Sequence, residues 1–138
     1  DIEEILKYDS KAKIISKIES EGGLNYVAKE FSGESRLMAA RGDLYMELKW
    51  PHMLPQHLEK ILEKDNSAIV ASRIFSSLAY QVEPSCSDVF DADNLLRMGY
   101  ETFMLGDEVC LKRETVLSAI NALAMMSQRY ELKNTKTK

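Results

Sequence analysis

Four short apolar runs in this chain each end in polar residues that could take part in chemistry. The residues that close these runs are Glu19, Asp43, Ser72, and the neighbouring pair Asp107 and Glu108. Apolar runs of this length, separated by longer helical patterns, are typical of parallel strands that are buried on both faces. Barrels of parallel strands build their active sites at the carboxyl ends of those strands. We therefore expect these polar residues to face one rim of an enzyme site.

Two acidic residues of this set, Glu19 and Asp43, could together bind a divalent cation. Mg²⁺ is usually bound by one or two carboxylates, with water and substrate oxygens completing its ligands. Adjacent strands of a barrel could bring both carboxylates to one ion, and a bound metal would orient a substrate and polarise its oxygen. The alternative for both acids is helix N-capping, or plain solvation at the start of a loop.

A basic residue, Lys17, lies two positions before the first of these acids. Because side chains alternate along a strand, Lys17 and Glu19 should point to the same face. Phosphoryl transfer depends mostly on positioning and on neutralisation of charge, so a lysine beside a metal would suit that reaction. The alternative is that Lys17 is only the ion-pair partner of a neighbouring acid.

The elements that would position these residues alternate between strands and helices. We expect strands over about 13–18, 36–40, 68–71 and 101–105. We expect helices over about 1–8, 24–31, 51–64, 88–98 and 114–130, with a short helical stretch through 75–78. Gly22 and Gly23 should interrupt the chain, and Gly99 should cap the helix that precedes it. This alternation favours right-handed parallel units of the α/β class.

Four strands are too few to close a barrel of this type, which has eight. An open four-stranded sheet is the alternative, but its edge strands would have to be covered. We therefore expect an α/β fold that is half of a parallel (β/α)8 TIM barrel, with four strand–helix units over residues 1–132. Residues 133–138 should form a polar tail. The sequence carries neither the glycine-rich dinucleotide motif nor the P-loop motif.

The formal net charge of −4 gives no electrostatic reason to expect nucleic acid or an anionic membrane as a partner. No apolar segment approaches the roughly 20 residues that span a bilayer. No signal-peptide pattern is present, so we expect a cytoplasmic location. Cys86 and Cys110 are expected to be reduced thiols. Because the sequence begins at Asp1, within a helical pattern, we expect that residues preceding it have been removed.

Five segments of the sequence resemble the pyruvate kinase family in their order and spacing. They are Lys-Ile-Ile-Ser-Lys-Ile-Glu (13–19), Leu-Met-Ala-Ala-Arg-Gly-Asp-Leu (37–44), Ala-Ile-Val-Ala-Ser-Arg-Ile-Phe (68–75), Ser-Asp-Val (87–89) and Phe-Met-Leu-Gly-Asp-Glu (103–108). The first two are highly specific, and the later three are weaker. The resemblance covers about residues 11–130. It implies that the chain is the second half of the family's catalytic barrel, strands five to eight.

The resemblance implies catalytic and metal-binding roles for three of the residues above. Lys17 would stabilise charge on the phosphoryl group in flight and on the enolate oxygen. Glu19 and Asp43 would hold the divalent metal, Mg²⁺ or Mn²⁺, that also binds the substrate.

The resemblance also implies where the substrate and the nucleotide bind. Backbone N–H groups around Ala40, Gly42 and Asp43 would bind the carboxylate of phosphoenolpyruvate or pyruvate. Ser72 would lie on the protonation side of the enolate, where the family usually has a threonine; the alternative is a loop-capping hydroxyl. Glu108 would lie near the nucleotide.

The sequence departs from the family pattern in three places. The family's Ser-Gly-Glu-Thr segment reads Gly-Asp-Glu-Val at 106–109 and loses two hydroxyls. The usual Thr-Gln-Met-Leu-Glu is Ser-Arg-Ile-Phe-Ser at 72–76, and Pro-Thr-Arg-Ala-Glu is reduced to Pro-Ser-Cys at 84–86. The first barrel half, which in the family supplies monovalent-cation ligands and much of the nucleotide site, is absent from this sequence. Any K⁺ would therefore be bound by residues outside this chain.

Three hypotheses follow for the function. The first is a pyruvate kinase-like phosphotransferase that forms pyruvate and ATP from phosphoenolpyruvate and ADP in glycolysis, with the isolated chain inactive. The second is a Mg²⁺-dependent aldolase or lyase of the phosphoenolpyruvate/pyruvate barrel group. The third is a non-catalytic fragment that self-associates, since a half barrel would expose sheet edges and an apolar inner face. Either the missing barrel half or a second copy would be its partner, and we expect a homo-oligomer.

Overall fold

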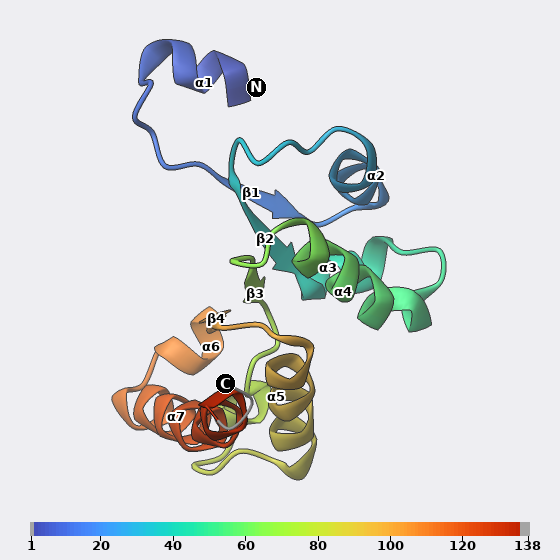
Figure 1. The fold of residues 1–138 in the computed structure, drawn as a ribbon. Coiled ribbons are helices and arrows are strands. Elements are labelled where there is room, and N and C mark those ends of the chain that lie inside the picture. The colour runs from blue at the N-terminus through green and yellow to red at the C-terminus, as the bar shows by residue number, and fades with distance from the viewer. Residues whose placement is uncertain (1, 136–138) are drawn as a thin grey trace. The chain divides into compact units, whose positions relative to one another are not determined.

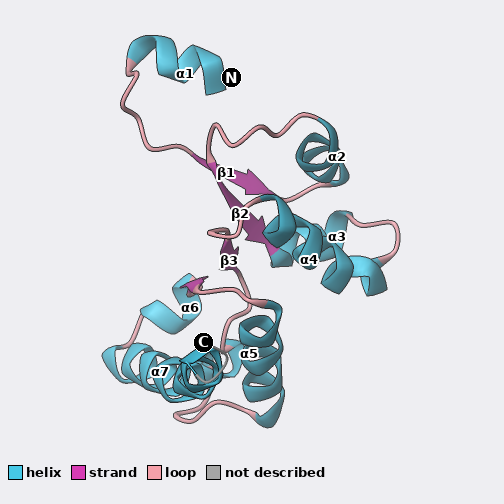
Figure 2. Cartoon of the chain, in the orientation of Figure 1, coloured by secondary structure: helices cyan, strands magenta, loops and turns pink. Residues whose placement is uncertain are grey.

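The computed structural model describes residues 2–135, with side chains described as far as Tyr130. The chain divides into two compact units, the first ending at Ala71 and the second beginning at Ser72. Figure 1 traces the order of the elements along the chain, and Figure 2 separates the helices from the strands. None of the helices in the described part of the chain is long and apolar enough to cross a membrane.

The first unit contains three parallel strands with helices between them. Its elements are α1 (Ile2–Tyr8), β1 (Ile15–Ile18), α2 (Glu21–Lys29), β2 (Arg36–Ala40), α3 (Arg41–Glu47), the 3-10 turn η1 (Pro51–Met53), α4 (Leu54–Lys64) and β3 (Ile69–Ala71). Strand β2 is paired on one side with β1, where Lys17 lies opposite Met38. On the other side it is paired with β3, where Ala40 lies opposite Ala71.

The core of the first unit is centred on β2. Leu37, Ala39 and Ala40 are fully buried, as expected for a strand with neighbours on both sides. Helix α4 buries Leu58 and Ile61, which are three residues apart and therefore lie on one helical face. The apolar pattern of each element thus determines which of its faces packs inward.

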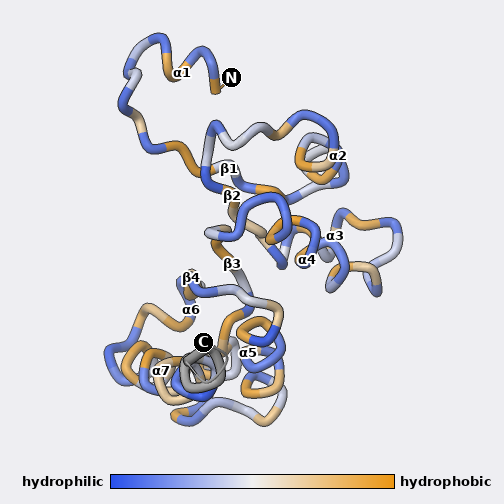
Figure 3. The backbone as a smooth tube through the Cα atoms, in the orientation of Figure 1, coloured by the Kyte–Doolittle hydropathy of each residue, from blue (hydrophilic) through white to orange (hydrophobic). Residues whose placement is uncertain are grey.

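The second unit continues the alternation of strand and helix. Its elements are the 3-10 turn η2 (Ser76–Ala79), α5 (Cys86–Met98), β4 (Thr102–Met104), α6 (Asp107–Cys110) and α7 (Arg113–Thr135). Figure 3 shows hydrophobic segments along both α5 and α7. Buried apolar residues of this unit include Phe75, Leu95, Tyr100, Val109 and Ala119.

The predicted α/β class is confirmed, because four strands alternate with helices along the chain. The predicted strand at 36–40 has the observed bounds, and the other three are observed one or two residues shorter. Gly99 caps α5 as predicted, with a left-handed φ of 111° and its N–H donated to the carbonyls of Leu95 and Leu96.

Several local predictions were wrong. Gly22 and Gly23 do not interrupt the chain but form the first turn of α2, because the Ser20 side chain caps that helix by accepting from the Gly23 N–H at 3.2 Å. The segment after β2, for which no element was predicted, is helix α3, since burial of Leu44 fixes it against the core. The predicted helix at 51–64 begins with a 3-10 turn.

Two further helices differ from the prediction. The Ser85 cap starts α5 at Cys86, two residues earlier than predicted. Helix α7 extends to Thr135, within the segment 133–138 for which a polar tail was predicted. Residues 136–138 lie outside the described part of the chain.

Asp65 links the starting ends of β2 and β3. Its carboxylate accepts hydrogen bonds from the Leu37 N–H at 2.7 Å and from the N–H and hydroxyl of Ser67 at 2.9 and 2.7 Å. Burial raises the pKa of Asp65, but these hydrogen bonds outweigh burial and hold the pKa below its ordinary value. The ionised carboxylate thus stabilises the pairing that brings the other ends of the strands together.

We predict that Asp65→Ala lowers the free energy of unfolding by about 2 kcal/mol, because it leaves the donors at Leu37 and Ser67 without this acceptor. Since the folded-state pKa is depressed, the contribution should be present above the unfolded pKa of about 3.9 and be lost as the pH falls below it. Chemical denaturation of Asp65→Ala at neutral and acidic pH tests this, with the neighbouring Asn66→Ala as control. Equal stability losses for the two variants would contradict the prediction.

Candidate active site

Three charged side chains converge at one edge of the first unit. The Lys17 ammonium Nζ lies 2.6 Å from Glu19 Oε2 and 3.2 Å from Asp43 Oδ2. Each of the three side chains is about half exposed, at 52%, 48% and 57% respectively. We call this group the Lys17 cluster. It is open to solvent and could be reached by a small ligand.

The parallel pairing of β1 with β2 explains why these residues meet. Lys17 is in β1, and Glu19 directly follows that strand. Asp43 lies in the first turn of α3, which begins immediately after β2. Because parallel strands run in the same direction, both carboxylates emerge at the carboxyl edge of the sheet.

The flanking residues turn the charged side chains outward. Ile18, between Lys17 and Glu19, is 2% exposed, so strand alternation places both charged neighbours on the opposite face. Leu44 is fully buried and anchors α3, while the adjacent Asp43 is exposed. The apolar core thus determines where the charges lie.

The electrostatics of the Lys17 cluster favour the charged lysine. Hydrogen bonding to Glu19, followed by that to Asp43, raises the pKa of Lys17 above its ordinary value. Ion pairs this exposed contribute little to stability, typically about 0–1 kcal/mol, since water and salt screen them. Stability alone is therefore a poor explanation for gathering three charges from two strand ends.

The donor set of the Lys17 cluster fits a hard divalent cation. Two carboxylate oxygens lie within 3.2 Å of one cationic nitrogen, so the ammonium occupies the place of a cation between them. No group of three or more His, Cys, Asp or Glu residues that could hold a metal occurs among the described residues. Two carboxylates with room for water and substrate oxygens are what Mg²⁺ requires, whereas structural zinc requires four protein ligands.

The predicted backbone donors lie beside this cluster. Ala40 is the last residue of β2 and the N-cap of α3, and Gly42 and Asp43 are in the first helical turn. Backbone N–H groups of a first turn have no partner within the helix, so those of Gly42 and Asp43 suit an anionic group, whereas Ala40 belongs to the strand and is paired opposite Ala71. The structure therefore brings Lys17, Glu19, Ala40, Gly42 and Asp43 to one edge of the first unit.

The remaining predicted residues belong to the second unit. Ser72 directly follows β3, is partly buried, and has a left-handed φ of 70°. Glu108 is exposed in α6, and its carboxylate folds back over Gly106, where an added Cβ would lie only 2.5 Å from either carboxylate oxygen. Both follow strand ends, as predicted.

One buried acid was not among the predicted site residues. Asp88 lies in the second unit, is 8% exposed, and accepts hydrogen bonds from residues in two segments, Ser77 and Ser85. The sequence signal for it was the spacing Ser85-x-x-Asp88, which is typical of a capping box. That pattern predicts a helix start but not the additional contact with Ser77.

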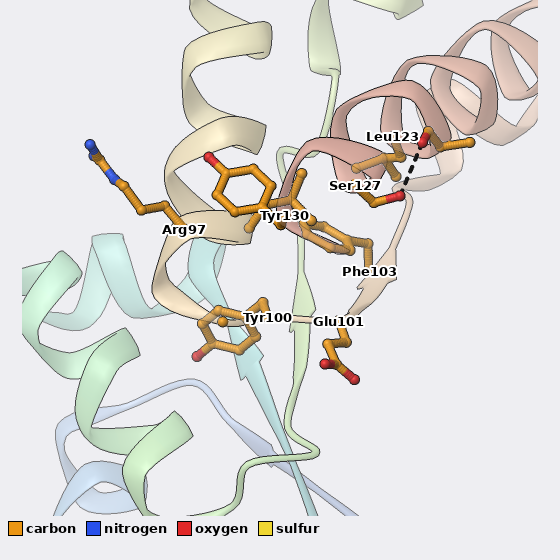
Figure 4. A pocket seen from close by; sticks show the side chains of 10 residues that line it. Arg97, Tyr100, Glu101, Phe103, Leu123, Ser127 and Tyr130 are labelled. Carbon is orange, nitrogen blue, oxygen red and sulfur yellow. Dashed lines mark hydrogen bonds between the residues drawn. The ribbon is translucent and has the colours of Figure 1, made fainter. Parts of the chain in front are cut away.

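A cavity of 740 Å³ in the second unit lies between α5, β4 and α7. Figure 4 shows that Tyr100, Phe103 and Tyr130 contribute aromatic rings to it. The Tyr130 hydroxyl lies 2.7 Å from Asp93 Oδ1, and this hydrogen bond to the carboxylate is accounted for by packing of α5 on α7. None of the predicted site residues lines this cavity.

A lysine and two carboxylates at the ends of adjacent parallel strands form a site of the kind that parallel α/β barrel enzymes carry at their carboxyl rim. The family model described as "Pyruvate kinase, barrel domain" matches residues 1–113. The chain belongs to the pyruvate kinase family, a family of transferases, and its fold is part of the family's barrel.

Individual relatives support this assignment. The chain is 30% identical to "Pyruvate kinase 1" of Candida glabrata, over 96% of this chain and 29% of that protein. It is also 30% identical to "Pyruvate kinase 1" of Saccharomyces cerevisiae, over the same shares of the two proteins. "Pyruvate kinase" of Thermoplasma acidophilum is 28% identical over 86% of this chain and 22% of its own length. The chain thus spans less than a third of the length of these relatives.

We predict that Glu19→Gln and Asp43→Asn each lower the pKa of Lys17 toward its ordinary value, because each removes a negative partner of the ammonium group. The effect of Glu19→Gln should be larger, since that carboxylate is closer. The measurement is a pH titration of the Lys17 side-chain carbon resonances by NMR. Glu47→Gln, one helical turn beyond Asp43 in α3, is the control. An unchanged Lys17 pKa in both test variants would show that the three charges do not interact in solution.

Proposed function

We propose that this chain supplies the second half of the barrel of a pyruvate kinase-like phosphotransferase. The complete enzyme would transfer the phosphoryl group of phosphoenolpyruvate to ADP and form pyruvate and ATP, the reaction of glycolysis. The observation that carries the proposal is the Lys17 cluster, in which one ammonium lies within 3.2 Å of two carboxylates from adjacent strand ends. Family membership supports the same reaction class.

Lys17 would neutralise charge on the transferring group and on the enolate oxygen. Transfer passes through a state with charge spread over the phosphoryl oxygens, so a fixed ammonium lowers its energy. To act on the substrate, the ammonium would exchange one or both of its carboxylate partners for a substrate oxygen. Its exposure of 52% supports this role, since no packing has to be disrupted for the side chain to turn.

Glu19 and Asp43 would hold Mg²⁺, or Mn²⁺ in its place. When bound, the metal would supply Lewis acidity and orient substrate oxygens. The backbone N–H groups at Ala40, Gly42 and Asp43 would bind the substrate carboxylate next to it.

Two residues of the second unit would act in protonation of the enolate and in binding of the nucleotide. Ser72 would lie on the side where the enolate takes its proton, and Glu108 would lie on the nucleotide side. Both positions follow strand ends, which is where the family resemblance places these two roles.

The proposed activity requires partners beyond this chain. The remaining barrel strands would complete the nucleotide site, and any K⁺ would bind to residues outside this chain. We propose that the isolated chain is inactive, that it self-associates as a homo-oligomer through its open sheet edges, and that it acts in the cytoplasm. Exposed strand edges favour such association because their backbone groups are free to pair.

A second candidate is a Mg²⁺-dependent aldolase or lyase acting on a keto acid. It is favoured by the segment 106–109, which lacks the family's two hydroxyls, and by the Glu108 carboxylate, which lies against Gly106. Both differences affect the proposed nucleotide side and leave the Lys17 cluster unchanged. ADP-dependent formation of pyruvate distinguishes the two candidates, because an aldolase or lyase would not need ADP.

We predict that Glu19→Ala and Asp43→Ala each reduce pyruvate formation from phosphoenolpyruvate and ADP by more than about 100-fold. Loss of an outer-shell partner of a metal ligand already costs about 10- to 100-fold, and loss of a ligand should cost more. The assay uses a full-length or reconstituted protein that contains this chain, with Mg²⁺ present.

Glu47→Ala is the matched control for this assay. It removes an exposed acid from the same short helix as Asp43 and should retain nearly full activity. Full activity in both the Glu19 and the Asp43 variant would refute the proposed function.

A further inference from the structure

The segment that follows β3 has an unusual backbone. Three residues that are not glycine adopt left-handed conformations, with φ of 70° at Ser72, 57° at Arg73 and 52° at Phe75. Such conformations cost on the order of 1 kcal/mol or more each, and they persist only where surrounding contacts fix them. Strain of this kind is concentrated at functional sites in proteins. Contacts with the surrounding residues must therefore maintain the left-handed backbone at Ser72, Arg73 and Phe75.

Apolar packing holds the middle of this segment. Ile74, Phe75 and Leu78 are each 1% exposed, so they anchor the segment and the following η2 turn in the core of the second unit. Ser72 is only partly buried and lies at the end of the strand. The η2 turn is joined directly to this segment, because the Leu78 N–H donates to the Phe75 carbonyl at 3.0 Å. Contacts that hold η2 therefore also act on residues 72–75.

Asp88 is hydrogen-bonded to η2 through Ser77. Its Oδ2 accepts hydrogen bonds from the Ser77 N–H at 3.2 Å and from the Ser77 hydroxyl. It also accepts from the Ser85 N–H at 3.3 Å. The Ser77 hydroxyl oxygen in turn accepts from the Ser85 N–H at 2.9 Å. Two segments of the chain, at 77 and at 85, are thereby tied to one buried carboxylate.

Capping of α5 does not account for this arrangement. The capping box needs only the reciprocal contacts between Ser85 and Asp88, and both of these are present. The two hydrogen bonds from Ser77 are additional, and they come from a turn that is not part of the helix. A carboxylate that is 8% exposed and accepts this many donors is a fixed anchor.

We propose that Asp88, acting through Ser77, is a positioning residue that maintains the left-handed conformation of residues 72–75 and so orients the Ser72 hydroxyl. The inference rests on the proposed function, in which Ser72 lies on the protonation side of the enolate. Asp88 itself does not touch the reacting atoms. Its loss should therefore impair the proton step more than the binding of phosphoenolpyruvate.

The test measures exchange of the methyl protons of pyruvate with D₂O by NMR, using a full-length or reconstituted protein that contains this chain, with Mg²⁺. This exchange is the reverse of enolate protonation and does not require ADP. Asp88→Asn and Ser77→Ala should each slow the exchange by about 10- to 100-fold, as expected when a reacting group is displaced by about 1 Å. Ser77→Thr keeps the hydroxyl and should restore most of the rate. KM for phosphoenolpyruvate should stay within about 3-fold.

Asp93→Asn is the matched control. Asp93 is in the same helix and accepts a hydrogen bond from Tyr130 at 2.7 Å, but among the described residues it makes no hydrogen bond to Ser77 or Ser85. It should leave the exchange rate unchanged even if it lowers the unfolding temperature as much as Ser77→Ala does. This comparison separates positioning from general stability, and Ser77→Ala keeps the test valid if Asp88→Asn fails to fold.

The outcomes distinguish this inference from the function on which it rests. Slower exchange in Ser72→Ala with a normal rate in Ser77→Ala would overturn the role of Asp88 and leave the proposed function intact. A normal rate in Ser72→Ala would also overturn the inference, because there would be no site hydroxyl to position. Absence of any exchange or pyruvate formation in the unsubstituted protein would instead contradict the proposed function.

Discussion

The attraction between one ammonium and two carboxylates at the end of a parallel strand pair is the interaction on which the site depends. Lys17 could not contact both Glu19 and Asp43 if β1 and β2 ran in opposite directions, because their carboxyl ends would then lie at different edges. The apolar residues between the charges supply the rest of the arrangement. Ile18 and Leu44 are buried, and the charged residues next to them are thereby turned outward.

The starting ends of β2 and β3, at the edge of the sheet opposite the Lys17 cluster, contribute to stability. There, Asp65 accepts hydrogen bonds from the backbone at Leu37 and from Ser67, and it does so as a partly buried carboxylate with satisfied partners. The acids of the Lys17 cluster are about half exposed, whereas the Asp65 carboxylate accepts three hydrogen bonds from Leu37 and Ser67. This division matches parallel barrels, in which the carboxyl rim carries chemistry and the amino rim carries stability.

Strand positions could be predicted from the sequence because burial on both faces leaves a continuous apolar run. The apolar run at 37–40 lies between Arg36 and Arg41, and the strand at 36–40 was predicted with the observed bounds. Helix α3 could not be found in this way, because Arg41-Gly42-Asp43 is typical of a turn and the helix depends on tertiary burial of Leu44. The start of α2 was predicted too late for a similar reason. Gly22 and Gly23 have poor helix propensity, but the Ser20 cap compensates for it.

The candidate site was predictable to the extent that it follows strand ends. Glu19 and Asp43 were predicted from polar residues that close apolar runs, and Lys17 from strand alternation. The three side chains do meet. The contact of Asp88 with Ser77 was not predictable, because it joins residues 11 positions apart through a turn whose shape the sequence does not encode locally. The assignments of Ser72 and Glu108 remain predictions from the family resemblance.

The most direct measurement is a crystal structure of a protein containing this chain, grown with Mn²⁺ and examined by anomalous scattering. We predict one Mn²⁺ at about 2.1 Å from a carboxylate oxygen of Glu19 and from one of Asp43, with the Lys17 ammonium moved out of the space between them. Lys17 still bridging both acids, with the metal bound elsewhere or nowhere, would contradict the assignment of these carboxylates as metal ligands.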